Sequence, residues 1–409
     1  MPKILCLTGY SLDRPDCGAS VRALNVFRLL AQVGEVRVVL ASHSEAHLRD
    51  ARSQVGGFEL VDVVHFRPTG RLPLADRLRY EFDGRFLNTY GYRAAAKDID
   101  RLHALLASHD MVWIHGLRIA NGFGLWRWPR SVLDIDDIQS CVHRTAMVRA
   151  RSFLQKLRQY RQVVMWRRRE RPLLERFEAL CVCSAPDRDE LGRILGASDR
   201  VHVLPNGYTV PKESSHRRLT VPPRIGFVGS FHHTPNREGL DWFIRRVWPA
   251  ILRTTPEARL RVVGDGSDRE VWKTIENVDV LGWVADVESE MATWSLTVVP
   301  IFVGGGTRIK TAEAFSRKCP VVSTALGVYG YEVVDGREVL IADSAEEFAS
   351  KCLRLLAEPP AGAAMAEIAW QQFLKHWTWD SYADRVAEVV NMVLQTKMSP
   401  YNQEASSAQ

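Results

Sequence analysis

The sequence lacks the features of a protein that crosses or leaves a membrane. No apolar run reaches the roughly 18 residues that a bilayer-spanning helix needs. The first ten residues, MPKILCLTGY, run straight into a strand-like pattern, without the charged region, long apolar core and cleavage site of a signal peptide. We therefore expect a cytoplasmic protein, and peripheral attachment to the inner face of the cell membrane remains compatible with the sequence.

Cysteine is also too scattered to build a disulfide framework or a zinc site. None of the cysteines forms a CxxC pair, and no histidine spacing suits zinc. We expect reduced, mostly buried thiols. The seven cysteines are Cys6, Cys17, Cys141, Cys181, Cys183, Cys319 and Cys352.

Composition sets broad limits. The 409 residues are enough for two domains, and a hydrophobic fraction of 46% is ordinary for a globular protein. Lysine and arginine exceed aspartate and glutamate by six, a modest excess that is weak evidence for any anionic partner. We expect no nucleic-acid partner.

The most informative stretch is 297–324, TVVPIFVGGGTRIKTAEAFSRKCPVVST. Residues 296–301 predict a strand, 304–306 a glycine turn, 310–317 a helix and 320–323 the next strand. In such a unit a ligand binds at the carboxyl end of the strand, where the N–H groups at the start of the helix attract anions.

The residue types at that turn favour a diphosphate. Gly305 and Gly306 let the backbone approach a phosphate closely, and Arg308 and Lys310 follow Thr307 with two positive charges. Glu313, three residues after Lys310, could accept hydrogen bonds from ribose hydroxyls. Taken alone, the motif is equally compatible with a surface turn followed by a solvated helix.

Strands alternate with helices along the whole chain, which predicts two parallel sheets. The segment 210–223 is rich in proline, serine and charge and has no apolar period, as is typical of a linker. We predict one domain over 1–210, a second over 211–376, a helix over about 377–398 and a disordered tail at 399–409. Expected strands are 3–8, 36–41, 59–66, 111–115, 131–135, 180–184, 201–205, 224–228, 259–263 and 278–281.

A basic segment interrupts the first half. Cations recur over 144–176 with apolar residues between them, which predicts one or two amphipathic helices. Two interpretations stay open: a helix with a solvated basic face, and a face for anionic lipid headgroups.

Five motifs in this order resemble the retaining GT-B glycosyltransferases of family 4. The resemblance covers nearly the whole chain and is strongest from residue 203 to about 343. The motifs are VLPNG at 203–207, FVGS at 227–230, VVGDG at 262–266, LGWV at 281–284, and the long stretch from Val299 to Thr324.

The resemblance implies an α/β protein of two Rossmann-like domains, with parallel sheets facing an interdomain cleft and a nucleotide sugar on the second. It implies that the final helix crosses back to the first domain, that Glu313 takes the ribose hydroxyls, and that Gly18 brings the first loop to the phosphates. The residues expected to bind the donor are Gly18, Gly229, Ser230, Gly282, Trp283, Val284, Gly305, Gly306, Thr307 and Glu313.

The chain departs from the family pattern at two places. The family often has two glutamates seven residues apart, and Gly305 stands at the first of these positions. Ser230 stands where an arginine is usual, and the following loop, 232–237, looks longer than usual. We expect Arg308 and Lys310 to supply the missing positive charge.

Three further residues are candidates for catalysis. His115 ends an expected strand and matches a family position that faces the donor sugar, although a lone histidine is often structural. Asp136 and Asp137 follow the next strand, where a carboxylate could orient or deprotonate an acceptor hydroxyl. The run DIDD also resembles a metal-binding DxD, but the resemblance favours a metal-independent enzyme.

The resemblance, together with these residues, predicts a retaining glycosyltransferase of hexosyltransferase type. Its expected catalytic residues are Arg308, Lys310, His115, Asp136 and Asp137. The donor is a nucleotide sugar, no further cofactor is expected, and the acceptor is a hydroxyl of a cell-surface glycan, a lipid-linked oligosaccharide or another glycoconjugate. The alternatives are a sugar-nucleotide epimerase or a phosphorylase on the same architecture, and a non-catalytic nucleotide-sugar-binding subunit.

Overall fold

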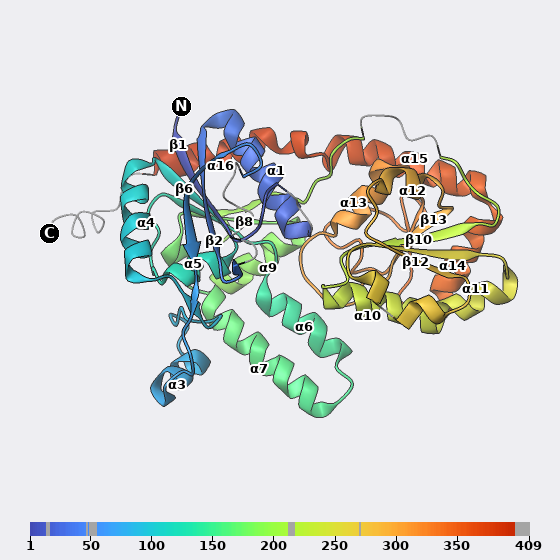
Figure 1. Ribbon diagram of the computed structural model, residues 1–409, viewed down its shortest axis with the longest axis horizontal. Helices are drawn as coiled ribbons and strands as arrows, with labels where there is room; N and C mark the ends of the chain where they lie inside the picture. Colours follow the sequence, from blue (N-terminus) through green and yellow to red (C-terminus); the bar gives the residue numbers. More distant parts are fainter. Residues whose placement is uncertain (14–16, 46–47, 49–54, 212–216, 270, 397–409) are drawn as a thin grey trace. The chain divides into compact units, whose positions relative to one another are not determined.

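The computed structural model describes residues 1–13, 17–45, 48, 55–211, 217–269 and 271–396. The chain divides into two compact units, one of Met1–Pro205 with Tyr382–Gln409 and the other of Asn206–Ser381. Figure 1 shows both, coloured along the sequence. The expected disordered tail at 399–409 and part of the expected linker lie outside the described residues.

The first unit is built on a seven-stranded sheet in which all neighbouring strands are parallel. Its strand order is β3-β2-β1-β6-β7-β8-β9, so the direction of winding reverses between β1 and β6. Ligands of doubly wound sheets bind at the carboxyl ends of the strands near this reversal. The strands are β1 (Lys3–Thr8), β2 (Glu35–Ser42), β3 (Glu59–His65), β6 (Met111–His115), β7 (Ser131–Asp134), β8 (Ala179–Val182) and β9 (Val201–Val203).

Helices connect these strands, and a short hairpin of β4 (Arg67–Pro68) with β5 (Tyr92–Arg93) lies outside the main sheet. The last helix, α16, contacts α1 and belongs to this unit. The helices are α1 (Gly18–Val33), α3 (Leu74–Phe82), α4 (Ala96–Ser108), α5 (Leu117–Phe123), α6 (Gln139–Arg149), α7 (Phe153–Glu170), α8 (Leu173–Arg176), α9 (Ala185–Leu195) and α16 (Ala383–Gln395).

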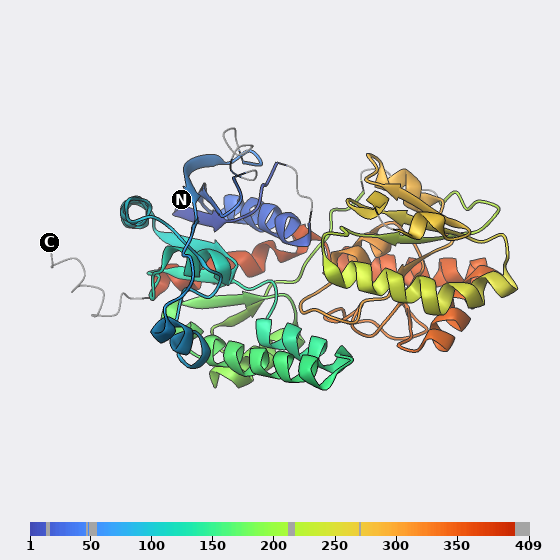
Figure 2. The same cartoon turned by 60° about the horizontal axis from the view of Figure 1, so that its bottom comes forward.

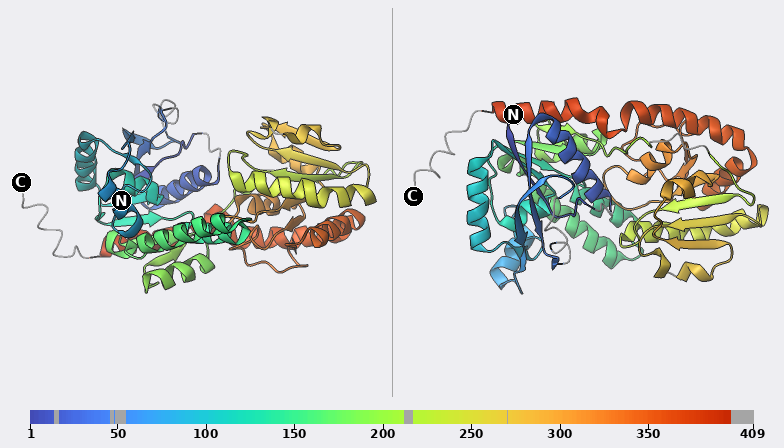
Figure 3. Two further views of the ribbon diagram at one scale, coloured as in Figure 1. Left: turned by 90° about the horizontal axis from the view of Figure 1, so that it is seen from below. Right: turned by 45° about the horizontal axis from the view of Figure 1, so that its top comes forward.

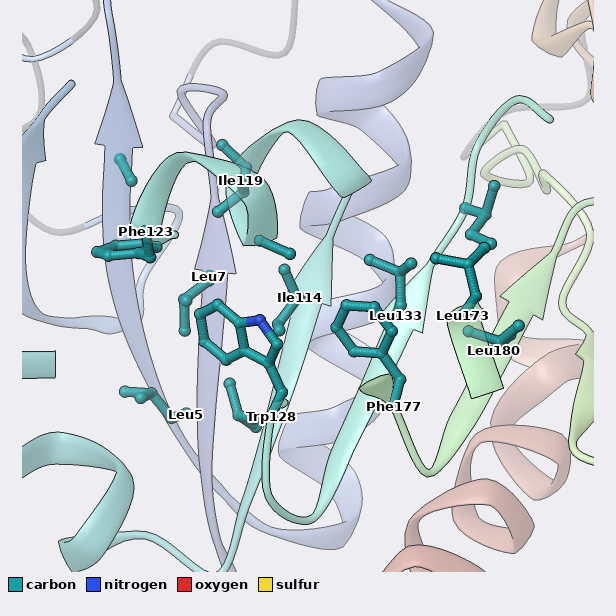
Figure 4. Packing of buried hydrophobic residues seen from close by; sticks show 14 of the residues in the cluster. Leu5, Leu7, Ile114, Ile119, Phe123, Trp128, Leu133, Leu173, Phe177 and Leu180 are labelled. Carbon is teal, nitrogen blue, oxygen red and sulfur yellow. The ribbon is translucent and has the colours of Figure 1, made fainter. Parts of the chain in front are cut away.

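The core of the first unit forms because its strands are apolar on both faces, as parallel strands between helices must be. Leu7 and Ile114, on adjacent strands, are completely buried, and the ring of Trp128 lies beside them (Figure 4). Leu133 and Phe177 continue the same cluster toward β8.

The basic segment forms two antiparallel helices, α6 and α7, that pack against each other as a hairpin (Figures 1 and 3). Ser152 caps α7, because its hydroxyl accepts a hydrogen bond from the N–H of Gln155 while the Gln155 side chain reaches back. No helix among the described residues is long and apolar enough to cross a membrane.

The second unit contains a six-stranded parallel sheet in the order β12-β11-β10-β13-β14-β15 (Figure 2). Here the winding reverses between β10 and β13, the strand that opens the glycine-rich stretch. The strands are β10 (Arg224–Val228), β11 (Arg259–Val263), β12 (Val278–Gly282), β13 (Leu296–Val299), β14 (Val321–Ser323) and β15 (Leu340–Ile341).

The helices of this unit follow the same alternation. The α-helices are α10 (Thr234–Trp242), α11 (Trp248–Thr254), α12 (Val287–Ala292), α13 (Ile309–Ser316), α14 (Ala345–Ala357) and α15 (Pro359–His376). Short 3₁₀ turns lie at Ser267–Arg269, Val271–Thr274 and Trp379–Tyr382. A π-helical turn, Phe243–Val247, joins α10 to α11.

One sequence prediction is wrong in this unit. The loop expected over 232–237 is mostly helical, because α10 begins at Thr234 and the connection after β10 ends at His233. Pro235 sits in the first turn, where its fixed φ suits a helix and its missing N–H costs nothing.

Candidate functional site

Three glycines bring the carboxyl ends of β10, β11 and β12 together. The N–H of Gly229 donates to the carbonyl of Val263 over 3.0 Å, and the N–H of Gly264 donates to the carbonyl of Gly282 over 2.8 Å. Gly264 has φ +139°, and a Cβ there would lie 1.9 Å from the carbonyl oxygen of Gly229. The close approach of these loops therefore requires glycine at position 264.

Arg308 stands at the residue before α13 and folds back over the glycine turn. Its Nη1 donates to the carbonyl of Gly305, and its Nη2 would lie 2.7 Å from a Cβ on Gly304, where φ is +138°. The Nε and Nη2 atoms of Arg308 are buried and have no hydrogen-bond partner among the residues that the structure describes. Because an unsatisfied buried cationic donor is costly, this guanidinium is ready to accept an anion.

Lys310 lies on the first turn of α13, with its amine buried beside β10. Its Nζ donates to Oδ1 of Asn236 over 2.7 Å and lies 4.3 Å from the centre of the Phe227 ring. Burial, followed by the positive charge of Arg308, lowers the pKa of Lys310 to about 7, although Glu313 acts in the opposite direction. The amine is therefore half protonated near neutral pH, and a bound phosphate would favour the charged form.

Gly229 and Ser230 complete the surroundings of this amine. A Cβ on Gly229 would lie 2.9 Å from Nζ of Lys310, so a larger residue would crowd the amine. The carbonyl of Ser230 accepts a hydrogen bond of 2.7 Å from the amide of Asn236, which fixes the orientation of that side chain. Sequence reasoning missed Asn236, because the helix that carries it was expected to start later.

Glu313 is engaged by two residues of its own unit. Its Oε1 accepts a hydrogen bond of 2.8 Å from the hydroxyl of Tyr208 and lies 3.4 Å from Nη1 of Arg317. Arg317 also donates to the Tyr208 hydroxyl over 3.1 Å and lies over the Tyr208 ring. Burial, and then the charge of Glu313, raises the pKa of Tyr208, so the phenol stays protonated.

Sequence reasoning missed both partners of Glu313. Arg317 could have been found, because it follows Glu313 by four residues on a predicted helix, which is the spacing of a salt bridge. Tyr208 directly follows the VLPNG motif, but no local pattern connects it with Glu313.

The VLPNG motif itself is tied to the glycine turn. The N–H of Asn206 donates to Oγ1 of Thr307 over 3.3 Å, and the amide of Asn206 donates to the carbonyl of Thr307 over the same distance. Gly306, the residue before, has φ +62°. The hydroxyl of Tyr331 donates to the carbonyl of Arg308 over 2.8 Å and holds the other side of the turn.

Three of the residues expected to bind the donor lie at the end of β12. Gly282 has φ +71°, Trp283 is 72% exposed, and Val284 is half-buried against the core. Trp283 thus presents an open aromatic face, which suits stacking with a flat ring.

In the first unit, a buried cluster of three residues lies at the carboxyl ends of β6 and β7. His115 places Nδ1 3.3 Å from Oδ2 of Asp134, and Arg22 of α1 grips the same carboxylate through Nη2 at 2.6 Å and Nε at 3.0 Å. Since an ionised carboxylate only accepts hydrogen bonds, Nδ1 of His115 carries a proton. All three side chains are buried.

The charge state of this cluster follows from its contacts. Burial alone would raise the pKa of Asp134, but the charge of Arg22 and the hydrogen bond from His115 outweigh burial and lower the pKa to about 2. Sequence reasoning named His115 but not Arg22 or Asp134. The sequence did contain a signal for Arg22, because it is the only charged residue within 18–27.

The remaining candidates also belong to the first unit. Asp136 is half-buried, and the thiol of Cys183 lies 3.5 Å from its Oδ1. Asp137 is half-buried as well, and Gly18 is the first residue of α1. The ring of Tyr10 meets the His115 ring edge-on at 5.8 Å. Within the described residues, no group of three or more His, Cys, Asp or Glu side chains is placed to hold a metal ion.

Comparisons with known proteins agree with this arrangement. Residues 222–358 match the family model described as glycosyl transferases group 1. A protein from Klebsiella pneumoniae, known as an uncharacterized 44.6 kDa protein in the cps region, is 26% identical over 157 residues. That match covers 36% of this chain and 40% of the relative, so it spans less than half of either protein.

Solved structures match over nearly the full length. Sucrose-phosphate synthase from Thermosynechococcus elongatus has a TM-score of 0.69 at 14% identity, covering 97% of this chain and 100% of that one. HepE from Anabaena, in complex with UDP and glucose, has a TM-score of 0.65 at 15% identity, covering 96% and 100%. The chain therefore has the GT-B fold expected from its sequence, and residues 222–358 of its second unit are similar to the glycosyl transferases group 1 model.

Proposed function

We propose that the chain is a retaining glycosyltransferase, which moves a sugar from a nucleotide-sugar donor to an acceptor hydroxyl. The observation that carries the proposal is the guanidinium of Arg308, two of whose buried donor atoms have no partner within the described part of the chain, next to the buried amine of Lys310 at the start of α13. Two buried cations that lack a carboxylate counter-charge for each favour the binding of a dianion. The diphosphate of a nucleotide sugar provides it.

The chemistry follows from this charge. The bond between the anomeric carbon and the diphosphate oxygen breaks, and the leaving diphosphate takes the electron pair. The acceptor oxygen forms a new bond on the same face and releases its proton. Arg308 and Lys310 stabilise the negative charge on the leaving group, which is the largest electrostatic demand of the step.

The other residues position the donor. Glu313 uses Oε1 for Tyr208 and Arg317, so we assign its Oε2 to a ribose hydroxyl. Trp283 stacks on the base. His115, held by Asp134, faces the donor sugar, while Asp136 and Asp137 orient or deprotonate the acceptor. Gly18, the first residue of α1, stays a candidate for contact with the donor. The reaction uses neither a metal ion nor a further cofactor.

The acceptor class is a hydroxyl of a glycan, a lipid-linked oligosaccharide or another glycoconjugate. HepE, which shares the fold, binds UDP and glucose, and this supports a nucleotide sugar as donor. We place the reaction in the cytoplasm, at the inner face of the cell membrane.

Thermal-shift measurements with UDP-, GDP- and dTDP-sugars test the donor site. A ligand at a hundred times its Kd adds about 2.7 kcal/mol to the stability of the folded state, so one of these sugars should raise the Tm clearly. Release of free nucleoside diphosphate then tests catalysis. Arg308→Ala and Lys310→Ala are each expected to lower turnover by at least about tenfold with the fold intact.

Two results would count against the proposal. If Arg308→Ala and Lys310→Ala both turn over the donor as fast as the wild type, these two side chains do not take part in catalysis. Donor binding without any release of diphosphate, with or without acceptor glycans, would favour a binding subunit. Activity that persists in EDTA is expected, and activity that is lost and then restored by Mg²⁺ or Mn²⁺ would contradict metal independence.

A further inference from the structure

The first two turns of α7 expose large apolar side chains. Phe153 is 78% exposed and Leu154 is 76% exposed, and Leu157 and Tyr160 continue the same exposed row. Their spacing of three and four residues puts Phe153, Leu157 and Tyr160 on one face of the helix. Apolar side chains gathered in this way commonly mark a binding surface on a protein.

A second row lies on α3, a helix in which no residue is buried. Leu74, Leu78 and Phe82 recur every fourth residue and are all exposed, so they form one stripe. The helix does not pack into the core, and burial therefore gives no reason for the stripe.

Contacts with α7 hold α3 in place. Nε of Arg161 lies 2.7 Å from Oε2 of Glu81, Arg169 donates to the carbonyl of Tyr80, and the guanidinium of Arg168 lies 5.8 Å from the Phe82 ring. In Figure 1 the two helices project on the same side of the first unit. We define the α3–α7 surface as Leu74, Leu78, Phe82, Phe153, Leu154, Leu157 and Tyr160.

The charge on the segment that contains α6 and most of α7 has one sign. The 32 residues from 138 to 169 contain nine arginines and lysines and no aspartate or glutamate. Arg144 and Arg167 pair with Glu190, and Arg161 pairs with Glu81. Among the described residues, Arg151, Lys156 and Arg158 form no ion pair, and all three are exposed beside the apolar row.

A basic pocket lies between the same two helices. Its volume is about 590 Å³, and its lining contains three arginines, Arg71, Arg77 and Arg161, against one glutamate, Glu81. Leu72 and Tyr80 complete the lining. One arginine guanidinium can donate hydrogen bonds to two oxygens of the same phosphate, so the pocket suits a phosphate-bearing headgroup.

We infer that the α3–α7 surface docks on a membrane that contains anionic phospholipids. The apolar rows enter the boundary between headgroups and acyl chains, the surrounding cations bind lipid phosphates, and the pocket holds one headgroup. The apolar row of α7 lies beside Arg151, Lys156 and Arg158, and this combination complements an anionic bilayer surface, which offers both apolar depth and dense negative charge. The inference does not depend on the proposed sugar transfer.

Flotation of the full chain with vesicles tests this docking. We expect the protein to float with vesicles of equimolar phosphatidylglycerol and phosphatidylcholine, and to remain at the bottom with phosphatidylcholine alone. High salt should weaken the binding, because it screens exposed charges.

Two sets of variants separate the contributions. Phe153→Ser with Leu154→Ser removes exposed apolar area, and Lys156→Glu with Arg158→Glu reverses two exposed charges. Glutamate near the amino end of a helix is favourable, so neither pair of changes should unfold α7. Each pair is expected to lower vesicle partitioning by about tenfold or more. Arg71→Gln with Arg77→Gln tests the pocket in the same assay.

Matched controls come from the second unit. Val271→Ser removes an equally exposed apolar side chain, and Arg253→Glu reverses an exposed cation; both should leave partitioning unchanged. Release of diphosphate from the donor should be the same in all these variants.

Equal flotation with neutral and anionic vesicles, or full flotation of both α7 variants, would overturn the inference. A dimer of the wild type that is lost in the variants, without flotation, would show that a second copy covers this surface and would likewise overturn it.

Discussion

Lys310 and Asn236 meet at the carboxyl edge of the six-stranded sheet, where Nζ of the lysine donates to Oδ1 of the asparagine over 2.7 Å. Asn236 is neutral, so this contact satisfies a proton of the amine without compensating its charge. The charged form of the amine is therefore buried without a counter-charge from Asn236, and this burial, together with the nearby charge of Arg308, lowers the pKa of Lys310.

The first prediction concerns this lysine and pH. The pKa of Lys310 is about 7 in the folded protein and roughly 10.4 in an unfolded chain. Between these values the unfolded chain binds more protons, so stability rises with pH, by up to about 1.4 kcal/mol per unit. Relative to Lys310→Met, the donor-free wild type should therefore gain stability as pH rises from 7 toward 10, measured by urea unfolding.

Lys273→Met, at an exposed lysine of the same unit, is the control and should follow the wild type. If the stability difference between the wild type and Lys310→Met stays constant over this pH range, the pKa of Lys310 is not lowered. The description of its amine as buried without a counter-charge would then be wrong.

The second prediction concerns Arg22. Arg22→Met leaves the Asp134 carboxylate buried without its cation, which should cost about 3 to 5 kcal/mol of unfolding free energy at pH 7. Arg28→Met, at an exposed arginine on the same helix, should change stability by less than about 0.5 kcal/mol. Equal losses in the two variants would contradict the structure.

The third prediction is the acid sensitivity of the same carboxylate. The pKa of Asp134 is about 2 when folded and about 3.9 when unfolded, so its contribution is complete above about pH 5 and is lost as pH falls through about 2. The shift corresponds to roughly 2 to 3 kcal/mol. Asp134→Asn should lose this part of the acid dependence, which a comparison of urea midpoints at pH 5 and pH 3 would reveal.

The fourth prediction concerns Tyr208, which positions Glu313. Tyr208→Phe removes the hydrogen bond to Oε1 and should cost about 1.5 to 3 kcal/mol of stability, as is usual for a hydrogen bond to a charged group. With Glu313 less fixed, the preference for a ribonucleoside diphosphate over its 2′-deoxy analogue should fall by severalfold, measured by titration calorimetry. Tyr160→Phe, at an exposed tyrosine, should change neither quantity.

The fifth prediction tests the meeting of the glycine loops. Gly264→Ala puts a Cβ 1.9 Å from the Gly229 carbonyl in a backbone conformation with φ +139°, so it should destabilise the protein by more than about 3 kcal/mol. Gly57→Ala has a similarly positive φ of +92° but open space around it, and it should cost only about 1 kcal/mol. Similar melting temperatures for the two variants would refute the close approach.

Much of the fold was predictable because strand signals are local. The strand Met111–His115 and the strands Lys3–Thr8, Arg224–Val228 and Arg259–Val263 match the structure at both ends. The start of α10 was predicted wrongly, because Pro235 was read as part of a loop when it begins the helix. Helix α3 was not predicted, although Leu74, Leu78 and Phe82 recur every fourth residue, which is a helical spacing.

The sequence by itself determined which loops form the candidate site: glycines after successive strands, two cations after one of them, and one glutamate on the following helix. Only the tertiary structure decided the partners. Arg22 and Asp134 are 112 residues apart, Tyr208 and Glu313 are 105 apart, and Lys310 and Asn236 are 74 apart. Contacts of this separation depend on strand order, and the sequence pattern fixes each strand without stating which strands become neighbours.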